Sequence, residues 1–216
     1  YFMEIAKIRA ARQLWASIVK AYGRSSDDIA RMSIHTETAS WNMTVYDPHV
    51  NMLRTTTESM SAVIAGVDSH LVTPYDAAFK RPEEFSERIA RNQQLLLKEE
   101  SYLDKVADPA AGSYYIENLT SSLMEEAWKL FLDVEEKGGY IESVKSGHIQ
   151  EKVRENAAML DQSLAFRKDS LLGTNQYPNN GERIEKYIPA DVFTPTDFTE
   201  GNSIAETLKP YRGAQA

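Results

Sequence analysis

The chain has 216 residues, of which 42% are apolar and 26% are charged, so it can form a packed domain and is not a wholly disordered protein. Its net charge of -8 argues against a general nucleic-acid binder, because phosphate contacts require clustered lysines and arginines. Cysteine is absent, which excludes disulfides and thiolate metal sites.

No apolar run approaches the roughly 20 residues that span a bilayer. We therefore expect no membrane partner and a cytoplasmic protein. The sequence begins with an apolar Tyr-Phe-Met run that leads directly into a helical pattern, which we interpret as a fragment of a longer polypeptide.

Helical spacing of apolar residues predicts a first helix over residues 4–22, closed by Gly23. Its basic side chains, including Arg9 and Arg12, lie mostly off the apolar stripe. We interpret this basic face as solvated, with a phosphate or an acidic partner as the alternative. Further helices are predicted over residues 48–66, 82–98, from the turn at 108–113 to about 137, 140–145 and 149–173.

One polar residue in the third of these helices stands out. Asn92 falls on or near the apolar stripe that is formed by residues 85, 89, 96 and 97. A buried amide must be hydrogen-bonded, so we expect Asn92 to tie a loop to the helix.

Two short apolar or β-branched runs, over residues 30–38 and 67–73, are predicted strands. Each ends in polar side chains and is followed by a helix, as in an α/β protein. A complete (β/α)8 barrel needs eight strands and typically about 250 residues, so this chain cannot close a barrel alone. The expected fold class is therefore α/β and predominantly helical: the C-terminal part of a (β/α)8 TIM-type barrel with a helical extension.

The composition shifts at Thr174, where proline, glycine and asparagine replace periodic apolar residues. We expect residues 1–173 to form the barrel portion and its extension, and residues 174–216 to form a linker or arm. The run at residues 187–193 is apolar enough to dock on another surface.

Many short motifs, in order along the chain, resemble the acyl-CoA-binding barrel of the methylmalonyl-CoA mutase family. The similarity extends from about Tyr1 to Tyr177, where the family continues into a linker and a cobalamin-binding domain. The matching positions are residues 2–12, Trp41, 46–48, Asn51, 54–55, 58–60, 87–93, 99–101 and 106–114.

The ends of the two predicted strands depart from the catalytic pattern of that family. Where the family carries Arg-x-His-x-Gln, this chain has Ser33-Ile-His35-Thr-Glu37. Where the family has His-Thr-Asn followed by Asp-Glu, this chain has Leu-Val-Thr73 followed by Asp76-Ala. An added carboxylate would repel a CoA thioester that carries its own carboxylate.

The resemblance therefore implies degenerate substrate-binding positions at His35, Glu37 and Thr73 and no catalytic, cofactor-binding or metal-binding residue. His35 could still donate a hydrogen bond to a thioester carbonyl, but we favour a vestigial histidine. His70 lies in a sequence similar to the family's cobalt-binding Asp-x-His-x-x-Gly but lacks the glycine, so we favour a structural histidine.

The resemblance also implies a reaction, a cofactor and a partner. In the family, adenosylcobalamin supplies a radical while methylmalonyl-CoA and succinyl-CoA interconvert. This chain is similar to the small, non-catalytic subunit type, whose partner is the catalytic large subunit that binds the cofactor. A catalytic acyl-CoA mutase of altered specificity and a CoA-binding regulatory barrel are the alternatives. Exposed strand edges would also favour self-association of the fragment.

Overall fold

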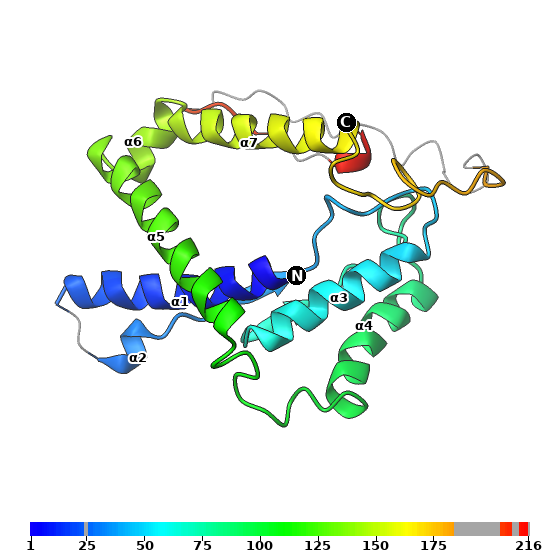
Figure 1. Cartoon of the computed structure of the whole chain (residues 1–216), viewed down its shortest axis with the longest axis horizontal. Helices are drawn as coiled ribbons and strands as arrows, with labels where there is room; N and C mark the ends of the chain where they lie inside the picture. The colour runs from blue at the N-terminus through cyan, green and yellow to red at the C-terminus, as the bar shows by residue number, and fades with distance from the viewer. Residues whose placement is uncertain (24–25, 184–203, 209–211, 216) are drawn as a thin grey trace. The chain divides into compact units, whose positions relative to one another are not determined.

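The computed structural model describes residues 1–23, 26–183, 204–208 and 212–215 (Figure 1). The predicted docking run at 187–193 lies outside these residues. The chain divides into two compact units, residues 1–38, 55–73 and 88–132 in the first and residues 39–54, 74–87 and 133–216 in the second. In chain order the elements are α1 (Phe2–Ala21), α2 (Asp27–Ala30), β1 (His35–Glu37), α3 (Val50–Ile64), β2 (Ser69–Leu71), α4 (Glu84–Glu99), α5 (Tyr114–Glu136), α6 (Tyr140–Lys145), α7 (His148–Ala165) and η2 (Gly213–Gln215).

The described residues are mostly helical and include a two-stranded parallel sheet of β1 and β2. The predicted α/β class is confirmed at this level. Both strands are shorter than predicted, and Ala30 belongs to α2. Beyond the ladder, a flanking residue makes a further bond, from Thr38 N to Leu71 O.

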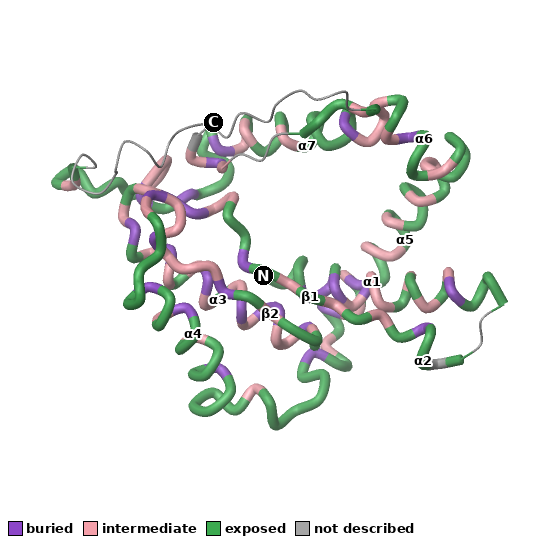
Figure 2. The backbone as a smooth tube through the Cα atoms, turned by 180° about the vertical axis from the view of Figure 1, so that it is seen from behind, coloured by how far each residue is buried: buried purple, intermediate pink, exposed green. Residues whose placement is uncertain are grey.

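The first unit is built on the apolar face of α1. Ile5 and Ile8 are buried there against Ala65, which follows α3, and Ile116, near the start of α5. Burying an aliphatic side chain of this size contributes about 1.5–3 kcal/mol, so these contacts hold α1 beside the segments that lead into β1 and β2. Figure 2 marks buried positions along α1 in purple.

The basic face of α1 is not simply solvated, which corrects the prediction. Arg9 contacts Asp108 and Glu117, and its side chain is only 13% exposed. Arg12 donates to the carbonyl oxygens of Met32 and Gly66. These two arginines join α1 to distant loops of the same unit, so neither a solvated face nor a phosphate site describes them.

The amide of α4 that bonds to another element is the half-buried Gln93, not Asn92, which is exposed. Gln93 Nε2 donates to Thr55 Oγ1 at 3.0 Å and to Thr56 Oγ1 at 2.7 Å. The inward stripe of α4 runs through Ser86, Ala90 and Leu97. Leu97 was predicted to face inward, whereas Phe85 and Leu96, which were also predicted to do so, are exposed.

Some helix ends are marked by glycine in the sequence, and others are not. Gly66 closes α3 with a φ of 74°, donating to Val63 O while Val67 donates to Ala62 O, the pattern of a Schellman motif. The same pattern closes α7 at Ala165, with the non-glycine residue Arg167 in the left-handed position at a φ of 56°. The predicted extension of this helix to 173 is therefore wrong.

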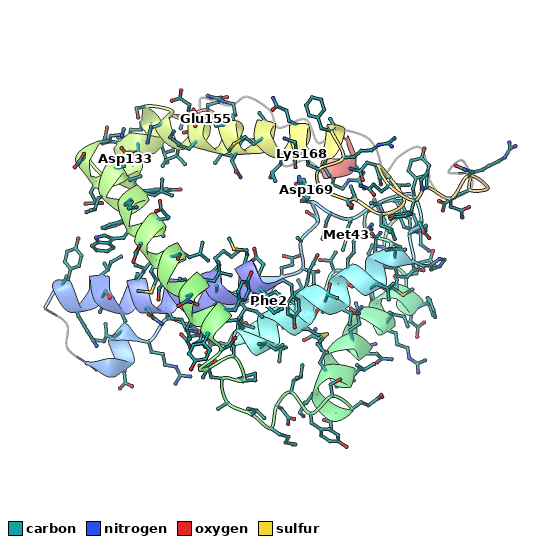
Figure 3. All side chains as sticks on the ribbon, in the orientation of Figure 1. Phe2, Met43, Asp133, Glu155, Lys168 and Asp169 are labelled. Atoms are coloured by element: carbon teal, nitrogen blue, oxygen red, sulfur yellow. The ribbon has the colours of Figure 1, made fainter. Side chains whose placement is uncertain are left out.

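The second unit contains α6, α7 and the loops that follow the two strands. Asp133, at the end of α5, accepts a hydrogen bond from His148 Nε2 at 2.9 Å and also pairs with Lys137 (Figure 3). These contacts link the end of α5 to the start of α7. Among the described residues, no helix is long and apolar enough to cross a membrane.

Candidate functional site

The two strands place alternate side chains on opposite faces of the sheet. His35 pairs in register with Ser69, Thr36 with His70, and Glu37 with Leu71. The first and third pairs are exposed, and the middle pair is half-buried. The side chains of a strand alternate with a period of two, so His35 and Glu37 share the exposed face.

On the exposed face, the predicted site residues bond to neighbours on the other strand. His35 Nδ1 lies 2.7 Å from Ser69 Oγ, and Thr73 Oγ1 donates to Glu37 Oε1 at 3.2 Å. The backbone of Thr73 also donates to Thr38 Oγ1 at 2.9 Å. The structure thus brings Glu37 and Thr73 together and gives His35 a different partner.

His70 faces the opposite side, where both ring nitrogens are engaged. Nδ1 lies 2.9 Å from Thr36 Oγ1, and Nε2 lies 3.0 Å from Ser59 Oγ on α3. Ser59 donates its own proton to Thr55 O, so we assign the donated proton to His70 Nε2. Burial lowers the pKa of His70, which favours the neutral ring. These contacts identify His70 as a structural link between sheet and helix.

A carboxylate organises the start of both strands. Asp68 Oδ2 accepts from the backbone N–H of Ile34 at 2.8 Å and from Arg12 at 2.8 Å. These two interactions hold the pKa of Asp68 below its usual range. Asp68 is therefore ionised at neutral pH and positions the chain just before β1, next to the bond from its own backbone to Ile34 O.

In the second unit, the loops that follow β1 and β2 meet at a buried amide. Asn51 is fully buried and bonds both the N–H and the C=O of Thr44, at 3.0 and 2.8 Å, and the carbonyl of Tyr75 at 3.0 Å. Arg54 donates to Asn51 Oδ1 and Thr44 Oγ1, and to Leu172 O at 2.8 Å. We call Thr44, Asn51 and Arg54, with the carbonyls of Tyr75 and Leu172, the Asn51 hub.

Sequence reasoning missed the hub, although Asn51 and Arg54 were among the positions that carried the family resemblance. The available signal was the short spacing between two polar residues near the start of an amphipathic helix. Their contacts show a structural role: they satisfy loop backbone groups that would otherwise be buried without partners.

Another retained acid, Asp76, is also in this unit. Its side chain is 1% exposed, and its carboxylate lies 3.5 Å from the Lys80 ammonium. A buried carboxylate needs a neighbouring cation to offset the loss of hydration. Asp76 thus forms an ion pair within its own turn.

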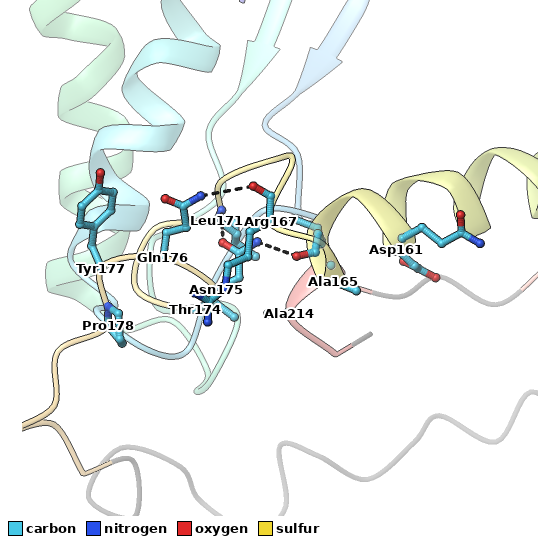
Figure 4. A pocket seen from close by; sticks show the side chains of 13 residues that line it. Asp161, Ala165, Arg167, Leu171, Thr174, Asn175, Gln176, Tyr177, Pro178 and Ala214 are labelled. Carbon is cyan, nitrogen blue, oxygen red and sulfur yellow. Dashed lines mark hydrogen bonds between the residues drawn. The ribbon is translucent and has the colours of Figure 1, made fainter.

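An open cavity of about 1080 Å³ lies beside the end of α7 in the second unit (Figure 4). Its polar side chains largely stabilise its own wall: Asn175 accepts from Leu171 N and donates to Leu164 O and Asp169 O. Within the described part of the chain, no cluster of three or more histidine, aspartate or glutamate side chains could hold a metal ion.

Comparison with known proteins identifies the family. The profile of methylmalonyl-CoA mutase matches residues 1–203. The methylmalonyl-CoA mutase small subunit of Porphyromonas gingivalis is 57% identical over 220 residues, covering 97% of this chain and 36% of that protein. The large subunit of the same bacterium is 38% identical over 192 residues, covering 89% of this chain and 26% of that protein.

The small subunit of Streptomyces virginiae is 38% identical over 194 residues, covering 90% of this chain and 31% of that protein. The chain thus spans about a third of the small subunits that it matches. Because the family profile covers nearly the whole sequence, the chain belongs to the methylmalonyl-CoA mutase family.

Proposed function

We propose that the chain is part of a non-catalytic small subunit of an adenosylcobalamin-dependent methylmalonyl-CoA mutase, an isomerase that interconverts methylmalonyl-CoA and succinyl-CoA. The 57% identity to a protein named as a small subunit, against 38% to a large subunit, supports this assignment. Its role would be to support a catalytic large subunit in a heterodimer.

The observation that carries the proposal is the arrangement at the strand ends. Polarising a thioester carbonyl needs hydrogen-bond donors aimed at its oxygen. Here the Thr73 hydroxyl donates to Glu37, and His35 Nδ1 pairs with Ser69. These groups bond across the sheet, and Glu37 adds a negative charge that an anionic acyl-CoA would have to approach.

His70, the histidine in the cobalt-binding-like sequence, does not fit the cobalt of adenosylcobalamin. A histidine ligand needs one free ring nitrogen, whereas His70 engages Thr36 through Nδ1 and Ser59 through Nε2. We therefore derive no step through the cofactor in this chain and assign cofactor binding to the large subunit.

The barrel assignment is part of the same proposal. The parallel pair β1–β2, with α3 in the connection between the two strands, is consistent with one repeat of a βαβ architecture. Residues 1–173 would supply the last units of a (β/α)8 barrel with a helical extension, and residues 174–216 would form an arm that follows it.

Turnover measurements on the whole protein test the proposal. The complete small subunit should show no mutase activity alone with adenosylcobalamin, and activity should appear when the large subunit is added. His35→Ala in the small subunit should leave the rate of the heterodimer unchanged.

Two outcomes contradict the proposal. Turnover by the small subunit alone would indicate a catalytic mutase of altered specificity. Loss of heterodimer activity in His35→Ala, with the subunits still associated by size-exclusion chromatography, would place His35 in the catalytic machinery.

A further inference from the structure

The C-terminal residues Arg212 and Gly213 contact both loops that follow the strands in the chain. Gly213 N donates to Trp41 O at 2.9 Å, in the loop after β1. Arg212 Nη1 donates to Ala78 O at 2.8 Å, in the loop after β2. The short helix η2 also packs against α7 (Figure 1). One short segment therefore joins three separate parts of the second unit.

Gly213 is required at this contact because of space. A Cβ atom added to Gly213 would lie 2.8 Å from Trp41 Cζ2 and 3.1 Å from Leu164 Cδ1. Its φ is outside the left-handed region, so its backbone conformation alone does not demand glycine. The wall formed by the Trp41 ring and Leu164 therefore selects a residue without a side chain.

The neighbouring arginine is recognised by a different chemistry. The guanidinium of Arg212 binds a backbone carbonyl, an acceptor that is fixed in place by the turn at Ala77–Lys80. That turn is closed by bonds from Phe79 N and Lys80 N to Asp76 O. The second unit thus presents the Ala78 carbonyl to Arg212. It presents the Trp41 carbonyl, beside a close apolar wall, to Gly213.

We propose that Trp41, Ala78 and Leu164 form a docking site for the Arg212–Gly213 segment of this chain, and that the docked segment latches together the loops after β1 and β2. The Asn51 hub connects the same two loops from the inside through Thr44 and Tyr75. The latch adds a second connection, so release of residues 212–213 loosens both loops while the hub keeps them folded.

Hydrogen exchange on the full-length protein tests this docking site. In Gly213→Ala, protection of the residue 213 amide should fall about tenfold or more, because overpacking against Trp41 expels the segment. Exchange should also quicken at residues 41–44 and 77–80. Arg212→Met should produce the same pattern, since it removes the bond to Ala78 O.

Gly181→Ala is the matched control. A Cβ atom there would lie 3.6 Å from its nearest neighbour, Asn179 Oδ1, and the φ of Gly181 is also outside the left-handed region. This variant should leave exchange at residues 41–44 and 77–80 unchanged. An equal effect of both glycine variants, or unchanged exchange in Gly213→Ala, would overturn the proposal.

A peptide added in trans separates docking from general destabilisation. A synthetic peptide of residues 204–216, at about millimolar concentration to match a tethered segment, should restore protection at residues 41–44 and 77–80 in Gly213→Ala. A peptide carrying alanine in place of Gly213 should not. Equal effects of the two peptides, or no effect of either, would show that this surface does not read the Arg-Gly pair.

Discussion

The exposed strand ends of the first unit and the buried Asn51 hub of the second unit use polar side chains in opposite ways. Glu37 and His35 are exposed, and they contact Thr73 and Ser69, respectively, across the strands. Asn51 is fully buried and bonds backbone groups from both loops.

This difference shows where the chain depends on its polar residues. A buried amide that satisfies backbone groups is costly to remove, because its partners are left desolvated and unpaired. An exposed pair exchanges its partner for water at little cost. The fold therefore relies on the hub, while the strand ends, where a catalytic barrel would carry its chemistry, are free to vary.

The largest loss of stability is expected from Asn51→Leu, which tests whether the fold depends on the hub. The substitution leaves Thr44 N, Thr44 O and Tyr75 O buried without their amide partner, so we expect the free energy of unfolding to fall by about 3 kcal/mol or more. Urea denaturation of the protein measures the change. Asn92→Leu, at an exposed position on α4, is the control and should change stability by less than about 0.5 kcal/mol; equal losses would remove the distinction.

Arg54→Met should have the next largest effect. Methionine keeps much of the aliphatic stem but removes the donors to Asn51, Thr44 and Leu172 O, for an expected loss of about 2 kcal/mol. The double variant with Asn51→Leu should lose less than the sum of the two single variants, because they share partners. Strict additivity in the same urea titrations would mean that the hub does not act as one unit.

The link between His70 and α3 predicts a smaller, pH-dependent effect. Burial lowers the pKa of His70 in the folded chain below the ordinary histidine value of about 6.5. Above that ordinary value the His70 ring is neutral in both the folded and the unfolded chain, so the contribution of His70 to stability is fully present. As the pH falls below 6.5, the unfolded chain binds the proton first and stability is lost. The loss continues until the pH passes the lower folded-state value.

Thermal unfolding between pH 7.5 and 5 measures the contribution of His70 to the pH dependence of stability. His70→Gln should flatten the dependence, whereas His49→Gln, at an exposed position, should leave it unchanged. The same slope in the protein and in His70→Gln would show that His70 does not contribute to the pH dependence.

The smallest change is expected from Glu37→Gln. Glu37 is exposed and accepts one bond from Thr73, which an amide oxygen can also accept, so stability should change by less than about 0.5 kcal/mol. The variant should also gain no mutase activity in the isolated subunit, because one amide does not restore the lost arginine. A substantial loss of stability would place Glu37 with the hub, contrary to the comparison.

The sequence predicted the helices well where glycine marks their ends, as at Gly23, Gly66 and Gly138, because a left-handed residue there favours glycine. It failed at the end of α7, where Arg167 takes the same conformation and Asn175 binds the Leu164 carbonyl from eleven residues further along. No glycine marks that boundary, so the pattern used for the other helix ends does not reveal it.

Site prediction followed a similar division. The family resemblance located His35, Glu37 and Thr73 at the strand ends, and the structural role of His70 followed from its imperfect sequence pattern. The contacts of Asn51, Gln93 and Arg12 were not predictable, because each depends on which loop lies opposite the side chain. Local patterns therefore located the strand ends, whereas partners distant in sequence revealed the polar residues on which the fold depends.

The most direct test of the central claim is the binding stoichiometry of methylmalonyl-CoA on the assembled heterodimer, measured by titration calorimetry. If the strand ends of this subunit no longer bind an acyl-CoA, one ligand should bind per heterodimer, and His35→Ala in this subunit should not change that value. Two ligands per heterodimer, with the second lost in His35→Ala, would contradict the account.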